Sequence, residues 1–167
     1  MGLVGFTVLC GVLLLGGEAS AQAEWWHNQL NQWQRDSLID SQANIDALNR
    51  ISGGSCKDYA RSLVLKVSRN VVNLPSNSSD SSWYPDPNVA QVYAPWWGLY
   101  RGQIVQMRIQ FFDGHYGPHT AVVDGIDLYG VWFIDSNFCS TNTVCRHYRT
   151  YDYLRAKVTA YSVYDIK

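Results

Sequence analysis

The spacing of apolar residues changes at Arg101, and this change constrains the fold more than any other feature of the sequence. Between positions 105 and 111, apolar residues occupy every second place and polar residues fill the places between them. This alternation is typical of a strand with one buried face. Further apolar runs follow, separated by turn residues. We therefore expect four more strands, over 119–126, 131–137, 146–153 and 157–164.

Before Arg101 the spacing is helical. Residues 24–50 are expected to form one helix with an apolar stripe at Trp26, Leu30, Trp33, Leu38, Ile45 and Leu48. After a glycine-containing break, Ser55 and Asp58 form a capping box that begins a second helix at Cys56. Its expected buried residues are Tyr59, Ala60, Leu63, Val64 and Val67. Helices followed by strands predict an α+β fold, in which N-terminal helices pack on an antiparallel sheet.

The first 21 residues differ from the rest of the chain. The apolar stretch 3–15 has the length of a signal-peptide core and is too short to span a bilayer. Small residues follow, and Ala19-Ser20-Ala21 fits a cleavage site. An uncleaved anchor is the alternative. The chain thus divides into an expected signal peptide at 1–21, a helical extension at 22–50 that packs on the domain or acts as a spacer, and one domain at 51–167.

Export and charge limit the partners of the mature chain. We expect it to be secreted, periplasmic or in the cell wall, with no membrane association after cleavage. The formal net charge is −1 and like charges do not cluster, so we expect no nucleic-acid partner.

The four cysteines fit an oxidising compartment. Cys10 lies in the expected signal peptide. Cys139 and Cys145 flank a short polar loop and are the natural disulfide pair after export. Cys56 is then left over, and an odd thiol in an exported protein is explained by reactivity, by burial or by pairing with another molecule.

Cys56 and His119 form the candidate catalytic pair. A cysteine in the first turn of a helix faces free backbone N–H groups and the positive end of the helix dipole, which favour the thiolate. A backbone N–H at this place can also hold an oxyanion. His119 opens a strand directly after Gly117-Pro118, where it can reach a helix N-terminus as the general base. His115, in a glycine-rich turn, is the rival base.

The following strand offers two side chains to orient His119. If its hairpin turn is centred near Leu128, the numbers of paired residues sum to about 256. His119 then faces Asn137, and Asp135 lies diagonally beside it on the same face. Either would accept the Nδ1–H of His119 and leave Nε2 for the thiol, as in a catalytic triad. The alternative is that 135–137 is only a polar strand end.

A metal site is the other chemical alternative for these residues. Zinc bound by Cys56, His119 and Cys139 or Cys145 is conceivable, but no C-x-x-C or H-x-x-x-H spacing supports it. We expect neither a metal nor another cofactor.

Four segments in this order resemble the CHAP family: GGSCKDYAR at 53–61, RGQIV at 101–105, GPHTAVV at 117–123 and FIDSN at 133–137. The resemblance covers roughly 51–167. It implies a cysteine/histidine-dependent amidohydrolase or peptidase with a papain-like fold. It also implies Cys56 as nucleophile, His119 as general base, Asp135 as the acidic orienter and Asn137 as the polar residue that follows.

The resemblance has departures and further implications. Ser55 precedes the cysteine where many members have glutamine, and Pro118 stands where glycine is common. In a papain-like layout the aromatic segment between Cys56 and His119 lines the cleft and stacks on sugars, with core packing as the alternative. The expected substrate contacts are Ser55, Trp83, Trp96 and Trp97.

Three functions follow from these residues. The first is hydrolysis of peptidoglycan, as the CHAP resemblance implies, either at the muramoyl–L-alanine amide or within peptide bridges. The second keeps the cysteine chemistry but acts on a protein or another amide. The third is a non-catalytic secreted module that binds glycan or a partner through Trp83, Trp96 and Trp97.

Overall fold

The computed structural model describes residues 15–167, so most of the expected signal-peptide core lies outside the described residues. The helices are α1 (Leu15–Ala23), the π-helix η1 (Glu24–Gln29), α2 (Gln32–Leu48), α3 (Cys56–Val67), the 3-10 helix η2 (Trp96–Gly98) and α4 (Tyr151–Lys157). The strands are β1 (Val89–Val92), β2 (Ile104–Gln110), β3 (Tyr116–Ile126), β4 (Gly130–Ser136), β5 (Val144–Thr150) and β6 (Val158–Ile166). Within residues 15–167, no helix is both long enough and apolar enough to cross a membrane.

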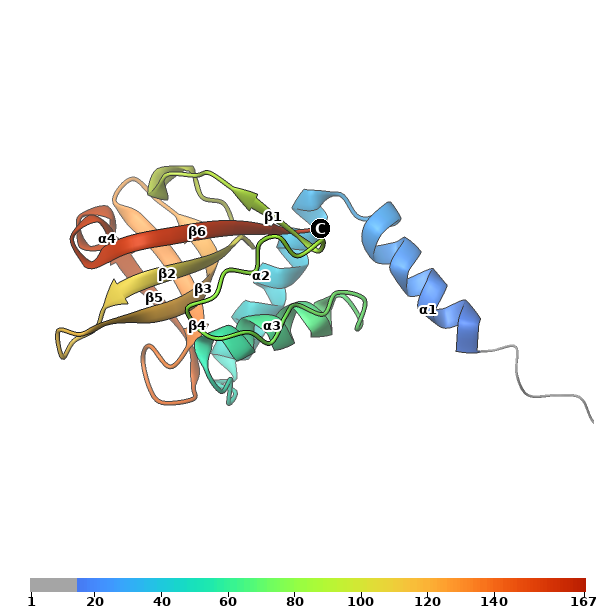
Figure 1. The fold of residues 1–167 in the computed structure, drawn as a ribbon, viewed down its shortest axis with the longest axis horizontal. Coiled ribbons are helices and arrows are strands. Elements are labelled where there is room, and N and C mark those ends of the chain that lie inside the picture. The colour runs from blue at the N-terminus through green and yellow to red at the C-terminus, as the bar shows by residue number, and fades with distance from the viewer. Residues whose placement is uncertain (1–14) are drawn as a thin grey trace, which may run out of the picture.

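The six strands form one antiparallel sheet in the order β1-β6-β2-β3-β4-β5. Helices α2 and α3 pack on one face of the sheet, and α1 points away from the domain (Figure 1). The predicted α+β class is therefore confirmed. Two of the elements that were not predicted belong to the sheet or pack beside it. One is the short edge strand β1, and the other is α4, which the Thr150 side chain caps by accepting the Tyr153 backbone N–H.

The β3–β4 hairpin has the register expected from the sequence. Val122 pairs with Ile134 and Val123 pairs with Phe133. A bulge near Gly125 shifts the pairing only at the turn end of the hairpin. The strand ends that carry His119 and Asp135 therefore lie side by side.

The helix expected over 24–50 is in fact two elements, η1 and α2. Leu30 is extended, and Asn31 caps α2 by accepting the Gln34 backbone N–H. The expected apolar stripe is wrong along α2, because Trp33 is 75% exposed and Leu48 is 84% exposed.

The buried face of α2 instead carries Ile39 and Ala43 with three aspartates, Asp36, Asp40 and Asp46. Two of these acids pair with basic side chains from other elements, Asp40 with Arg101 and Asp46 with Lys66. These pairs let a partly acidic helix face pack on the domain, since a buried charge needs a partner. The helix is thus part of the domain and not a spacer.

Asp36 predicts a pH-dependent stability. One of its oxygens accepts a 2.8 Å hydrogen bond from Gln32, while the other has no partner in the described part of the chain. Burial raises the pKa of Asp36 to about 7, above the ordinary 3.8. The folded protein therefore holds a proton that the unfolded chain releases, and this contribution to stability is lost as the pH rises from about 4 to about 7.

We expect Asp36→Asn to raise the free energy of unfolding at pH 8 by about 1–3 kcal/mol, because the amide is neutral at every pH. At pH 5 the gain should be much smaller. Urea titration followed by tryptophan fluorescence measures both values. Asp152→Asn is the matched control, since Asp152 is exposed. An equal gain at both pH values would contradict the prediction.

Candidate active site

Cys56 is the first residue of α3, and Ser55 is its N-cap. The Ser55 hydroxyl accepts the Asp58 backbone N–H at 3.2 Å and lies 2.7 Å from the Asp58 carboxylate. Both hydrogen-bonding roles of this hydroxyl are therefore used in capping α3, which fixes the backbone at the cysteine. Among the described residues, Cys56 is the free cysteine, and it is 8% exposed.

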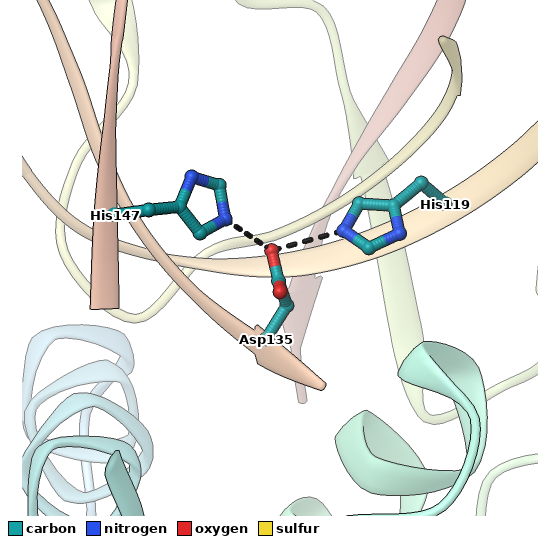
Figure 2. Close-up of side chains that lie close together, drawn as sticks. All are labelled: His119, Asp135 and His147. Atoms are coloured by element: carbon teal, nitrogen blue, oxygen red, sulfur yellow. Dashed lines mark hydrogen bonds and ion pairs between the residues drawn. The ribbon is translucent and has the colours of Figure 1, made fainter. Parts of the chain in front are cut away.

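His119 and Asp135 come from the adjacent strands β3 and β4, and both are buried. His119 Nε2 lies 2.9 Å from Asp135 Oδ2 (Figure 2). The sequence predicted the other ring nitrogen for this contact. Because Nε2 faces the carboxylate, Nδ1 is the nitrogen left for the thiol.

The Cys56 thiol and the His119 ring are close enough to shift each other's pKa toward the charged pair. Burial opposes ionisation of the thiol, but the hydrogen bond and charge of His119, with a backbone hydrogen bond from Thr120, lower the pKa of Cys56. Burial likewise opposes a charged imidazole, but the charge and hydrogen bond of Asp135 raise the pKa of His119 well above its usual range. Both shifts favour thiolate and imidazolium at neutral pH.

His115, the rival base, lies elsewhere. It sits in an exposed turn, where Nδ1 is 2.5 Å from Asp113 and the ring stacks on Phe111. The imidazole that contacts Cys56 is that of His119.

Asn137 does not orient the histidine. It lies just after β4 with a positive φ of 74°, and its side chain accepts the backbone N–H of Asn142. The structure assigns it to the loop closed by the Cys139–Cys145 disulfide, which is present as predicted. Of the two predicted orienters, Asp135 is the one that contacts His119.

His147 is the site residue that the sequence did not predict. It lies on β5 directly opposite Phe133 of β4, and its Nε2 is 2.5 Å from Asp135 Oδ2. Its side chain is 10% exposed. The available signal was the disulfide: a hairpin closed by Cys139 and Cys145 puts His147 on the same strand face as Cys145, which pairs with Asp135.

The ligand atoms of His119, Asp135 and His147 all lie within 4.8 Å of one another, so this set merits comparison with a metal site. At metal–ligand distances of about 2.0–2.1 Å, neighbouring ligand atoms would lie roughly 3.3 Å apart. The contacts of 2.9 and 2.5 Å are hydrogen-bond distances instead. The zinc alternative that used Cys139 or Cys145 is wrong, because both are in the disulfide.

A groove of about 410 Å³ lies between the loop 79–82 and the sheet, and its lining includes Pro118 but not Cys56, His119 or Asp135. One wall is the loop 79–82, and the floor comes from β2 and β6, with Pro118 of β3. Lys57, which follows the cysteine, holds the loop by hydrogen bonds to Asn77 and to the backbone carbonyls of Ser78 and Ser81. The nucleophile and the groove wall are thus fixed by adjacent residues of α3.

Two of the three tryptophans predicted to bind substrate are core residues, so that prediction is wrong for them. Trp83 is 1% exposed and packs against Tyr164, and Trp96 is 6% exposed and stacks on Tyr161. Trp97 is 62% exposed, beside Leu128 at the turn end of the β3–β4 hairpin. The non-catalytic binding module therefore loses two of the three side chains on which it depended.

No protein-family model matches the chain, and no curated protein matches it. Two solved structures have a similar fold. The crystal structure of Ly7917 is 17% identical and has a TM-score of 0.54, with 78% of this chain and 61% of that chain covered. The structure of Ly7917 with the hydrolyzing product of MDP is 14% identical and has a TM-score of 0.58, with coverages of 78% and 63%. This chain spans less than two thirds of Ly7917, and the likeness shows a shared fold.

Proposed function

We propose that this protein is a cysteine hydrolase of amide bonds, with Cys56 as nucleophile, His119 as general acid and base, and Asp135 as the residue that orients His119. The observation that carries the proposal is the position of Cys56 at the start of α3, where His119 lowers the pKa of the thiol, together with the 2.9 Å contact from His119 to Asp135. A nucleophile, a base and a residue that orients the base, connected in this order, are the elements of a catalytic triad.

The proton transfers use Nδ1 of His119, while Nε2 stays bonded to Asp135. The Cys56 thiolate attacks the carbonyl carbon of the substrate amide, and the backbone N–H groups at the start of α3 stabilise the resulting oxyanion. The His119 Nδ1–H protonates the leaving amine, so the C–N bond breaks and a thioester remains. His119 then accepts a proton from water, which attacks the thioester and releases the acid and the thiolate. Asp135 holds Nε2 throughout.

Peptidoglycan is the proposed substrate class. The similar structure that contains the hydrolyzing product of MDP, a peptidoglycan fragment, supports this choice. The CHAP resemblance of the sequence supports it independently, and we place the papain-like arrangement, the export signal and an extracellular or periplasmic site of action within the same proposal. The bond cleaved is either the muramoyl–L-alanine amide or an amide of the peptide bridges.

The test is digestion of purified sacculi, followed by mass spectrometry of the soluble products. An amidase releases free stem peptides, and an endopeptidase releases muropeptides with shortened or separated bridges. Casein is the parallel substrate for the alternative of a general peptidase. Unchanged sacculi together with cleaved casein would replace the peptidoglycan proposal by the peptidase alternative.

The lowered pKa of Cys56 predicts fast alkylation of the native protein. At pH 6.5 an ordinary thiol, with a pKa near 8.5, is about 1% thiolate. We expect iodoacetamide to modify native Cys56 at least about tenfold faster than the urea-unfolded protein at this pH. Peptide mapping identifies the modified residue, and the disulfide-bonded cysteines serve as internal controls. A native rate equal to or below the unfolded rate would contradict a reactive thiol.

A further inference from the structure

One carboxylate oxygen of Asp135 accepts two imidazoles. His119 approaches it from β3 and His147 from β5, with Nε2 to Oδ2 distances of 2.9 and 2.5 Å (Figure 2). Asp135 lies between them on β4 and is fully buried. The second histidine is therefore bound to the same atom that orients the catalytic base.

The partners of His147 indicate its protonation state. Its Nδ1 is buried and has no hydrogen-bond partner within the described ranges. A proton on Nδ1 would be a buried donor without an acceptor on a charged ring, which is costly. A neutral ring with its proton on Nε2 leaves only an unused lone pair at Nδ1, and it donates to Asp135. The surroundings thus favour a neutral His147 whose single proton is directed at the carboxylate.

Packing fixes the His147 ring in this orientation. Phe138 stacks on it with a centroid distance of 4.4 Å and an angle of 15° between the planes. The Arg149 guanidinium lies 4.2 Å from the centre of the Phe138 ring. His147 is therefore held as a rigid donor.

We propose that His147 is a positioning residue that competes with His119 for Asp135 Oδ2 and so limits how firmly Asp135 holds the proton of the catalytic imidazole. This inference rests on the proposed function, since it assigns a role within the same site. His147 acts through Asp135 and does not contact the thiol.

The competition predicts the direction in which removing His147 shifts the loss of the proton from His119. When His119 is protonated, its positive charge balances the Asp135 carboxylate. The hydrogen bond from His147 then contributes least to stabilising that carboxylate. When His119 loses its proton, the buried carboxylate depends most on His147. Removing His147 therefore destabilises the deprotonated form of His119 more than the protonated form. The base should then keep its proton to higher pH.

Other charged groups around this pair also affect its titration. Cys56 and Tyr59 face it from α3, and Arg149 faces it from β5. None of them is altered by a substitution at His147, so the comparison of variants isolates its contribution.

The test is the pH dependence of Cys56 alkylation by iodoacetate, compared with the neutral reagent iodoacetamide. The anionic reagent is attracted by the His119 imidazolium, so its rate relative to iodoacetamide falls as His119 loses its proton. In His147→Leu we expect this fall to move to higher pH by about 0.5–1 unit. His147→Gln, whose amide N–H can replace the Nε2 donor, should return the fall to near the wild-type pH. If the relative rate in His147→Leu falls at the same pH as in the wild type, or at a lower pH, the proposal is overturned.

A measurement on the unaltered protein guards against misfolding of the variants. The ¹⁵N spectrum of histidine-labelled protein at pH 8 should show His147 with Nε2 protonated and Nδ1 unprotonated. A proton on Nδ1 at this pH overturns the proposal. If the wild type itself shows no difference between the two reagents at any pH, the Cys56–His119 pair and hence the proposed function fail. If the wild type shows the expected difference between the two reagents and the His147 variants behave like the wild type, only this inference is refuted.

Discussion

Replacing Cys56 with alanine is expected to reduce peptidoglycan hydrolysis by at least about 10³-fold, because no other group can form the thioester. Cys56→Ser should be nearly as inactive, since a hydroxyl is a far weaker nucleophile and the helix start does not ionise it. Turbidity clearing of sacculi measures both variants against wild type.

Folding of the Cys56 variants is the necessary control. The change from cysteine to alanine removes one atom from a nearly buried place, so the thermal midpoint should change by only a few degrees. Ser62→Ala, on the exposed side of the same helix, should clear sacculi at the wild-type rate. Equal clearing by Cys56→Ala and wild type would refute the proposed mechanism.

Replacing Asp135 with alanine is expected to lower both activity and stability. Two buried imidazoles would lose their shared acceptor, and breaking a buried polar network of this kind costs about 3–5 kcal/mol. Without the carboxylate the imidazolium is no longer favoured, so hydrolysis should fall by about 10²–10³-fold. Urea unfolding and sacculus clearing give the two values.

The Asp135→Asn variant removes the negative charge but keeps nearly the same side-chain shape. Its amide oxygen can still accept one imidazole N–H, so more of the stability should remain than with alanine. The charge that raises the pKa of His119 is lost, and the alkaline limit of activity should move to lower pH. This is the opposite direction to that expected for His147→Leu. A limit that stays in place would show that the charge of Asp135 does not act on His119.

The parts of the site that depend on local sequence patterns could be predicted. A cap signal placed Cys56 at a helix start, and the centre of one hairpin brought the strand of Asp135 beside that of His119. Which His119 nitrogen meets Asp135 depends on the rotation of the ring, and residue spacing carries no information about that. Asn137 was misassigned because β4 ends at Ser136, where the chain turns into the disulfide loop.

The remaining errors came from contacts between distant segments. The stripe along α2 failed because Asp40 and Asp46 find basic partners elsewhere in the fold, and a helix pattern alone does not show such partners. Trp83 and Trp96 suit a sugar-binding surface or a core equally well by composition, and only the packed structure distinguishes the two. His147 required the register of β5, which the sequence pattern left open.

The attachment of the groove wall to Lys57 has a consequence for how this protein can diversify. Lys57 binds mainly to main-chain oxygens of the loop, those of Ser78 and Ser81, and any amino acid supplies these. The exposed side chains of Ser79 and Asp80 are therefore free to vary while the loop stays anchored one residue from the sulfur, whereas the Ser82 hydroxyl is bonded to Tyr164. Libraries randomised at these positions should yield altered substrate preference with the reactive thiol intact.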